Sequence, residues 1–344
     1  MLSRTTRILT LGLVLALVAS ACGSDAASTG DDAPTTDIPT TESAPPDSTT
    51  MNTAADVTTS DTTEPATVGG TADILDPEAP ELGRVVALAE EFLLADLLAL
   101  GIEPVASSAT VDAAGFQGVD QYDTSNIEVL PMTTLSLEYL ATLEPDTIIT
   151  LQFWVDQIGQ DVLDGLGEVI VVPDGLYGPE RLTAMGDLLE RPEHAAAMVA
   201  EYDAAMSSAQ AEVPDDCVLS LATVYSGPSV AAFVAGPWEI PSTILEVGCE
   251  LSPDASDAAP DQNGRAFLSL EQLGLLDSER LVLMQSDAVE GETEALEEIE
   301  ANPVWQSLPA VQSDNVVVID RLGYPGTPGQ IRLLEEISTV LAGS

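Results

Sequence analysis

The sequence predicts an α/β protein made of two Rossmann-like lobes that are joined by one long helix and enclose a cleft. Three observations support this fold class. From Arg84 onward, short apolar strands alternate with amphipathic helices. Two segments of the first half recur in the second half at a common offset of 133 residues. An uninterrupted helical pattern separates the two copies, so each copy is expected to fold as one lobe.

Residues 1–21 have the pattern of an export signal. Two arginines precede an uncharged, mostly apolar run over 8–18, which suits a signal-peptide core and is too short for a comfortable membrane span. Small residues lead to Cys22 in a pattern that resembles a bacterial lipoprotein box, with Ala19 where Leu is commonest. The resemblance implies lipidation of Cys22 and a lipid anchor in the cell membrane. Ordinary cleavage near Ala21 is the alternative, and both place the mature chain outside the cytoplasm.

Residues 22–78 are expected to form a disordered acidic tether. Thr, Ser, Ala, Asp and Pro dominate there, and too few large apolar side chains are present to offset the chain entropy lost on folding. The remaining chain divides into an N-terminal lobe over 79–190, a connecting helix over 191–213 and a C-terminal lobe over 214–344.

The N-terminal lobe begins with a strand at 84–89, followed by leucines at helical spacing up to a stop at Gly101. The repeat aligns this strand with the one after Cys217, and aligns Ser136-Leu-Glu with Ser269-Leu-Glu. In each copy the serine caps a helix that carries a glutamate in its first turn, and an apolar strand follows. Similar cap, helix and strand patterns occur in unrelated α/β proteins, which is the alternative to a true repeat.

The connecting helix starts at Pro192 and places Met198, Tyr202, Ala205 and Ala209 on one face. About 20 residues at 1.5 Å each give a rod of ~30 Å, which allows little hinge motion between the lobes. Parallel sheets bind ligands beyond the carboxyl ends of their strands, so two facing lobes predict one shared site.

Charge and composition exclude several classes of function. The chain has 58 acidic residues, nine basic residues and a net charge of -49, which excludes nucleic acid as a partner. The single histidine, His194, cannot form a histidine metal cluster or a catalytic triad, and no lysine is present. We therefore expect neither a metal site nor an enzyme, although paired carboxylates leave an acid–base hydrolase open. Cys217 and Cys249 are expected to form a disulfide in an exported chain.

Four segments resemble the substrate-binding proteins of ABC importers for iron-siderophores and cobalamin, the class III periplasmic binding proteins. They are the strand and helix at 84–101, the stretches 136–149 and 269–282, and the segment from Asn302-Pro-Val-Trp to Asp320. The resemblance implies a monomeric receptor that captures a ferric siderophore as transported ligand, needs no cofactor, and delivers it to an ABC permease with its ATPase. Cobalamin or haem is the alternative ligand, and an envelope scaffold or sensor with a degenerate cleft is the alternative of another class.

The same resemblance implies that one acid on each lobe engages arginines of the permease. The matching positions are Glu138 and Glu246, and two fixed carboxylates across the cleft would orient the guanidinium groups. Both residues could instead be ordinary exposed helix acids.

Ligand-binding residues are expected just after the strands, where aromatic side chains can bury large areas of a bulky chelate. The candidates are Trp154, Tyr177, Tyr225, Trp238, Arg265, Arg321 and Tyr324. Arg321 is the first candidate for an anionic group and Arg265 the second, although either could neutralise neighbouring acids instead. Loop packing is the alternative role for each aromatic residue, and Trp305 is assigned to the core. Because arginines are few, a neutral or weakly charged hydroxamate chelate is favoured.

Overall fold

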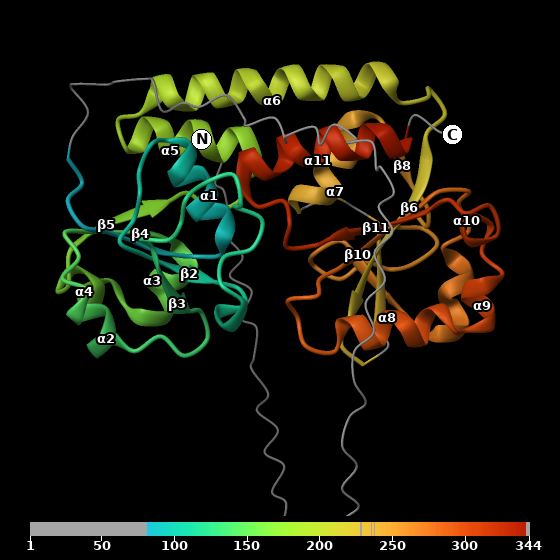
Figure 1. The fold of residues 1–344 in the computed structure, drawn as a ribbon, viewed down its shortest axis with the longest axis horizontal. Helices are drawn as coiled ribbons and strands as arrows, with labels where there is room; N and C mark the ends of the chain where they lie inside the picture. The colour runs from blue at the N-terminus through green and yellow to red at the C-terminus, as the bar shows by residue number, and fades with distance from the viewer. Residues whose placement is uncertain (1–80, 228, 235, 237, 342–344) are drawn as a thin grey trace, which may run out of the picture. The chain divides into compact units, whose positions relative to one another are not determined.

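The computed structural model describes residues 81–341 apart from 228, 235 and 237. These residues belong to one compact unit, in which two α/β lobes lie beneath the long helix α6 (Figure 1). The predicted export signal over 1–21, the lipidation site Cys22 and the tether over 22–78 lie outside the described residues.

The N-terminal lobe contains a five-stranded sheet with the order β3-β2-β1-β4-β5, and all its strands are parallel. The strands are β1 (Val85–Leu88), β2 (Ala106–Ala109), β3 (Glu128–Pro131), β4 (Thr147–Leu151) and β5 (Glu168–Val172). All four residues of β1 are buried, as the continuous apolar run of a central parallel strand predicts.

The helices of this lobe are α1 (Glu91–Ala99), α2 (Leu137–Thr142), α3 (Gln152–Ile158), α4 (Gln160–Asp164) and α5 (Gly178–Leu188), with a short 3-10 turn η2 (Asp112–Ala114). The predicted end of the first helix is confirmed, because α1 finishes at Ala99 and Gly101 has a φ of +73°. That left-handed conformation favours glycine, which lets the chain turn towards β2.

The C-terminal lobe contains a mixed sheet with the order β11-β10-β6-β7-β9, and β8 pairs with β6 outside this path. Its strands are β6 (Val218–Tyr225), β7 (Ser229–Phe233), β8 (Glu250–Leu251), β9 (Arg265–Leu268), β10 (Leu281–Gln285) and β11 (Val316–Asp320). This sheet is mixed and not wholly parallel, because β7 is antiparallel to both β6 and β9. A short turn with Gly227 at a φ of +73° returns the chain beside β6.

The C-terminal lobe also contains α7 (Glu239–Val247), η3 (Leu270–Leu275), α8 (Glu292–Glu300), α9 (Pro303–Gln306), α10 (Pro309–Gln312) and α11 (Gly326–Leu341). The internal repeat corresponds to equivalent elements, since α2 and η3 each follow the aligned serine. The hydroxyl of Ser136 accepts a hydrogen bond from the backbone N–H of Tyr139, and Ser269 forms a capping box with Gln272. The second copy is a 3-10 helix rather than an α-helix.

The connecting helix α6 spans Pro192–Glu212 and lies across both lobes (Figure 1). Met198, Tyr202 and Ala209 are buried as predicted, whereas Ala205 is half-buried. These residues belong to one hydrophobic cluster that continues from Leu97 in the N-terminal lobe to Leu221 in the C-terminal lobe. The two lobes therefore share a core, which opposes large hinge movements.

The last helix, α11, also ties the lobes together. Although it follows the C-terminal sheet, it packs against α1 and α5 of the N-terminal lobe and against α6. Arg332 of α11 donates a hydrogen bond to the backbone carbonyl of Gly118 and another to the side chain of Gln121. The C-terminal segment thus belongs structurally to both lobes.

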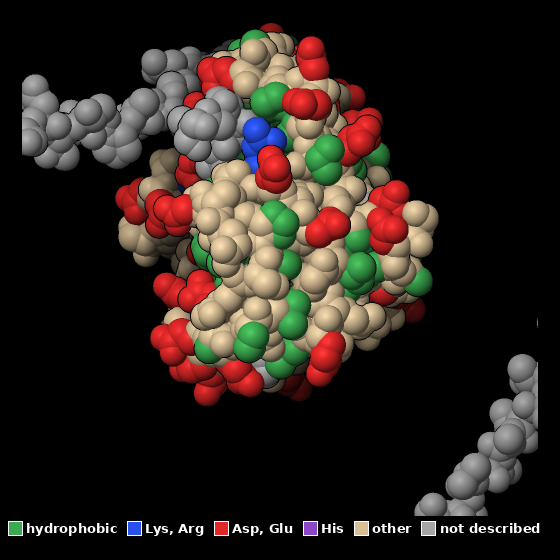
Figure 2. Space-filling view, turned by 90° about the vertical axis from the view of Figure 1, so that its right-hand side faces the viewer, with side chains coloured by type: hydrophobic (Ala, Val, Ile, Leu, Met, Phe, Trp, Pro, Cys, Tyr) green, Lys and Arg blue, Asp and Glu red, His purple; other side chains and the backbone are tan. Residues whose placement is uncertain are grey.

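The predicted disulfide is present between Cys217 and Cys249, which precede β6 and β8 and are both buried. Among the described residues, no helix combines the length and apolarity needed to cross a membrane. Acidic side chains are spread over the face of the C-terminal lobe in Figure 2, and basic atoms are visible there at a single spot.

Candidate ligand-binding cleft

The two lobes enclose a cavity of about 420 Å³. Its walls are formed beyond the carboxyl ends of β1, β4 and β5 in one lobe and of β6 and β11 in the other, where a ligand of paired α/β sheets is expected. The volume lies within the range of small-molecule sites. The cavity is more apolar than polar at its surface, and its polar groups come from both lobes.

Six of the seven predicted ligand-binding residues line this cavity. They are Tyr177, Tyr225, Trp238, Arg265, Arg321 and Tyr324. Trp154 does not line the cavity, because helix α3 starts at Gln152, directly after β4. The ring of Trp154 instead packs edge-on against that of Phe153, with the ring centroids 5.5 Å apart. The expectation that Trp154 lines the cleft is therefore corrected.

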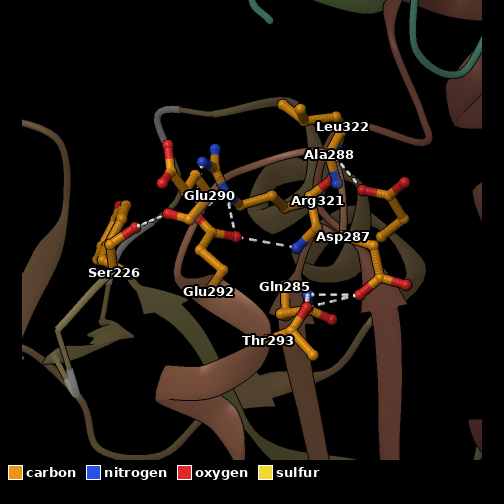
Figure 3. Close-up of polar contacts among 12 residues, drawn as sticks. Ser226, Gln285, Asp287, Ala288, Glu290, Glu292, Thr293, Arg321 and Leu322 are labelled. Carbon is orange, nitrogen blue, oxygen red and sulfur yellow. Dashed lines mark hydrogen bonds and ion pairs between the residues drawn. The ribbon is translucent and has the colours of Figure 1, made fainter. Parts of the chain in front are cut away.

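Arg321 follows β11 and is held by a buried carboxylate (Figure 3). Its Nη2 lies 2.7 Å from Oε1 of Glu292, and its Nε donates to both carboxylate oxygens at 3.0 and 3.1 Å. Glu292 also accepts the backbone N–H of Ser286 at 2.9 Å and is 0% exposed. The guanidinium carbon of Arg321 also lies 5.8 Å from the ring centroid of Tyr225. The charge of Arg321 is thus neutralised by Glu292, and its guanidinium group lies over an aromatic ring.

Arg265, at the start of β9, has a similar arrangement. Its Nη2 lies 2.9 Å from Oδ2 of Asp261, and its Nη1 donates to the hydroxyl of Tyr225 at 2.8 Å. The guanidinium carbon lies 5.4 Å from the ring centroid of Phe267. Neutralisation of nearby acids was the alternative role for both arginines, and each has such a partner.

A third arginine in the lining, Arg181 of α5, was not predicted from the sequence. Its Nε lies 2.8 Å from Oδ2 of Asp96 in α1, and its Nη2 lies 2.6 Å from Oε1 of Glu239 at the start of α7. Arg181 is 3% exposed, and its guanidinium carbon is 4.5 Å from the Phe92 ring centroid. Burial opposes the charged form, but Glu239 and Asp96 outweigh it and raise the pKa of Arg181.

The Arg181 ion pairs cross the boundary between the lobes, because Asp96 and Glu239 belong to different lobes. Asp96 also accepts the backbone N–H of Thr327 in α11 at 2.8 Å, and Glu239 accepts that of Gly326 at 3.3 Å. The network therefore joins α1, α5, α7 and α11 at the edge of the cavity.

Four carboxylates also line the cavity, in Glu90, Glu91, Asp174 and Glu239. Glu91 is engaged by Thr110, whose backbone N–H and hydroxyl donate to it at 3.0 and 2.5 Å. Glu90 directly precedes α1, and its side chain caps no backbone group there. Although its side chain is exposed to the cleft, loss of hydration there raises the pKa of Glu90, and Glu91 and Glu239 raise it further while Arg321 lowers it.

The remaining lining groups provide aromatic surface and one unused hydroxyl. Tyr177 and Trp238 line the cavity from different lobes and are each 42% exposed, so both have surface available for a ligand. Tyr324 donates its hydroxyl to Glu336 at 2.5 Å. Thr223 of β6 is 2% exposed, and its Oγ1 has no hydrogen-bond partner in the described part of the chain.

The sequence contained signals for three cavity residues that were not predicted, Glu90, Glu91 and Arg181. Glu90 and Glu91 come directly after β1, the position that identified the aromatic candidates, and Arg181 lies four residues after Tyr177. Aromatic and basic residues were the side chains expected to bind the ligand, so the carboxylates at the same strand ends were not predicted. Between residues 81 and 341, outside the three undescribed positions, no group of three His, Cys, Asp or Glu side chains is arranged to hold a metal ion.

The two predicted docking acids lie on different sides of the molecule. Glu138 is exposed at the start of α2, and Figure 1 shows α2 at the end of the N-terminal lobe away from α6. Glu246 is on α7, which packs against α6 and α11, and its Oε2 accepts the hydroxyl of Tyr202 at 2.8 Å. The repeat-related partner of Glu138 is Glu271, which is exposed on η3 beside α9.

Glu138 and Glu271 also have the same local environment. The backbone N–H of Glu138 and the hydroxyl of Ser136 lower the pKa of Glu138, and the backbone N–H of Glu271 and the hydroxyl of Ser269 lower the pKa of Glu271. Both carboxylates are therefore held ionised by equivalent capping groups.

Comparisons with known proteins agree with this architecture. No curated protein matches the sequence. Among solved structures, the chain is similar to Staphylococcus aureus SirA complexed with staphyloferrin B, with 16% identity, a TM-score of 0.62 and coverage of 75% of this chain and 92% of that one. It is also similar to the FhuD fold-family protein BSU3320 of Bacillus subtilis, a periplasmic binding protein component of a ferrichrome ABC transporter, with 20% identity, a TM-score of 0.62 and coverage of 78% and 97%.

A third similar structure is FhuD of Vibrio cholerae with Fe3+–Desferal bound, with 20% identity, a TM-score of 0.59 and coverage of 76% of this chain and 99% of that one. The model of one protein family, described as periplasmic binding protein, matches residues 86–321. With paired α/β lobes, a bridging helix and a cavity between the strand ends, the chain belongs to the periplasmic binding protein family.

Proposed function

We propose that this protein is the extracytoplasmic receptor of an ABC importer, and that it captures a ferric siderophore complex and delivers it to the permease. The observation that carries the proposal is the cavity of about 420 Å³, which aromatic side chains from both lobes line. The Staphylococcus and Vibrio proteins of the same fold bind staphyloferrin B and Fe3+–Desferal, which supports a chelate as the guest.

The geometry favours binding without catalysis. The arginines of the cleft are paired with carboxylates, and His194 is buried in α6 rather than in the cavity lining. The aromatic faces of Tyr177, Tyr225 and Trp238 offer contact area that costs little side-chain entropy on binding. A cavity of this size also favours a receptor over a scaffold whose cleft has closed.

Fluorescence titration tests the proposal. Trp238 lines the cavity, whereas Trp305 is buried in a separate cluster, so a bound ferric chelate should quench part of the emission in a saturable manner. The panel is Fe3+–Desferal, Fe3+–staphyloferrin B, cobalamin and haem. Trp238→Phe should lose much of the quenching yet retain iron in equilibrium dialysis. Failure of every panel member to bind the folded protein in dialysis would refute the proposed function.

For docking to the permease, we pair Glu138 with Glu271 in place of Glu246. Both are exposed, ionised and located on repeat-related elements, one in each lobe, which suits two guanidinium groups on a partner. Glu138→Ala combined with Glu271→Ala should abolish uptake in cells and leave chelate affinity unchanged. Glu246→Ala is the matched control, and loss of uptake in that control with normal transport by the double variant would reverse the assignment.

We further propose that the chain is a monomeric lipoprotein anchored through Cys22. The buried disulfide supports an oxidising compartment outside the cytoplasm. Mass spectrometry of the mature protein should find an acylated cysteine at the N-terminus, and Cys22→Ala should release the protein from the membrane fraction. An unmodified N-terminus at Cys22 or a membrane-bound Cys22→Ala variant would contradict this anchor.

A further inference from the structure

We propose that the cleft selects a ferric chelate that carries a protonated amine, and that Glu90 pairs with this amine. The proposal rests on the proposed function and identifies the charge class of its ligand. It follows from three features of the cavity: the neutralised arginines, an unpaired carboxylate and an unused buried hydroxyl.

The arginines provide little attraction for an anionic chelate. Arg265 and Arg321 each contact a carboxylate at 2.9 Å or less, and Arg181 contacts two. An anion would have to share these guanidinium groups with carboxylates that are fixed by further hydrogen bonds, such as Glu292 with the backbone N–H of Ser286. Because like charges would then lie close together in a partly dehydrated site, an anionic guest is disfavoured.

The acids of the lining differ in how they are engaged. Glu91 is bonded to Thr110, and Glu239 is paired with Arg181. Among the residues that the structure describes, the side chains of Glu90 and Asp174 have no hydrogen bond or ion pair, and Glu90 is the one at the carboxyl end of the central strand β1. A carboxylate in this position can accept hydrogen bonds from an ammonium group without breaking an existing contact.

Thr223 gives an independent indication that a polar ligand forms a hydrogen bond in this cavity. Its side chain lines the cavity from β6 in the opposite lobe, the residue is 2% exposed, and its Oγ1 has no partner in the described chain. A buried hydroxyl without a hydrogen bond is unfavourable, so a ligand that offers an oxygen or an N–H there relieves this cost. A hydroxamate chelate presents such oxygens, and a terminal amine presents the positive charge for Glu90.

A matched pair of ligands isolates the charge. Fe3+–Desferal is a trihydroxamate complex with one terminal ammonium group, and acetylation of that amine removes the charge while it keeps the iron centre. Wild-type protein should bind the charged complex about tenfold or more tightly than the acetylated complex, as expected for a charge-assisted hydrogen bond. Anionic ferric citrate should bind most weakly, and added salt should reduce the difference between the matched ligands.

Two variants assign the effect to a residue. Glu90→Gln should weaken binding of Fe3+–Desferal until it approaches that of the acetylated complex, whose own affinity should not change. Asp174→Asn tests the rival carboxylate, because Asp174 also lines the cavity and is exposed; the preference for the charged complex should survive this change even where overall affinity falls. Circular dichroism checks that both variants fold.

Several results would overturn the inference. These are equal binding of the matched ligands by the wild type, tightest binding of ferric citrate, an equal loss for both ligands in Glu90→Gln, or loss of discrimination only in Asp174→Asn. Each leaves the proposed function intact as long as some chelate binds. If no member of the wider chelate panel binds, the proposed function itself fails.

Discussion

Replacing Arg181 by methionine should strongly destabilise the protein. Methionine has a similar length and can keep part of the contact with Phe92, but it leaves Asp96 and Glu239 without their cation. Asp96 is 0% exposed, so water cannot solvate its uncompensated charge. The variant also weakens the connection between the lobes, because the two acids belong to α1 and α7.

The magnitude follows from the burial of the network. Removal of one partner from a buried ion pair typically costs about 3–5 kcal/mol, because the remaining charge stays dehydrated. For a domain of this size, 1 kcal/mol changes Tm by roughly 2–4 °C, so Tm should fall by roughly 6–20 °C. A second change should recover much of this loss, since Asp96→Asn with Glu239→Gln removes the uncompensated charges in the Arg181→Met background.

Thermal unfolding followed by circular dichroism measures this effect. Arg84→Met is the matched control, because Arg84 is exposed and its side chain donates one hydrogen bond, to the carbonyl of Leu143 at 3.0 Å. Its Tm should change by no more than a few degrees. If Arg181→Met unfolds within 2 °C of the wild type, the buried network does not stabilise the junction between the lobes as argued.

The remaining predictions concern the disulfide, salt and pH. Reduction of the buried disulfide should lower the free energy of unfolding by about 3–4 kcal/mol in the chain-entropy model, and urea unfolding with and without dithiothreitol measures it. Raising NaCl from about 0.1 to 1 M should raise Tm, because it screens repulsion within a chain of net charge -49; an unchanged Tm in differential scanning fluorimetry would contradict this. Dehydration raises the pKa of Glu90, Glu91 and Glu239 raise it further, and Arg321 only partly offsets this rise. The protonated form of Glu90 therefore stabilises the folded state at low pH, and this contribution is lost as the pH rises from 4.5 through the raised pKa. Glu90→Gln should therefore be stabilised relative to the wild type at pH 7 but not at pH 4, and the opposite order in urea unfolding would refute this sign.

The sequence predicted the parts of the fold that depend on local patterns. The buried run of β1, the end of α1 before Gly101 and the extent of α6 follow from hydrophobic spacing and from a residue that permits positive φ. The offset of the repeat predicted equivalent elements in the two lobes, and the structure places α2 and η3 at those positions.

Contacts between distant segments could not be predicted in this way. The bond from Thr327 to Asp96 joins residues 231 positions apart, and no local pattern indicates that α11 returns to the N-terminal lobe. The position after a strand also does not specify the direction of a side chain. Trp154 and Tyr225 both lie near the carboxyl end of a strand, β4 and β6 respectively, but only Tyr225 lines the cavity. Helix α3 starts directly after β4 and keeps Trp154 out of the cavity.

The shared core and the Arg181 network together explain why recognition in this cleft should depend on charge rather than on lobe closure. Hydrophobic contacts through α6 and the ion pairs from Arg181 of α5 to α1 and α7 hold the walls in place before a ligand arrives. Buried carboxylates likewise hold Arg321 and Arg181 in position, so these cations cannot reorganise around an anion without leaving a buried acid unpaired. The arginines therefore serve mainly to hold the acidic scaffold together. The charge available to a ligand is then one that the scaffold leaves unpaired, and we assign this role to the carboxylate of Glu90 at the end of β1.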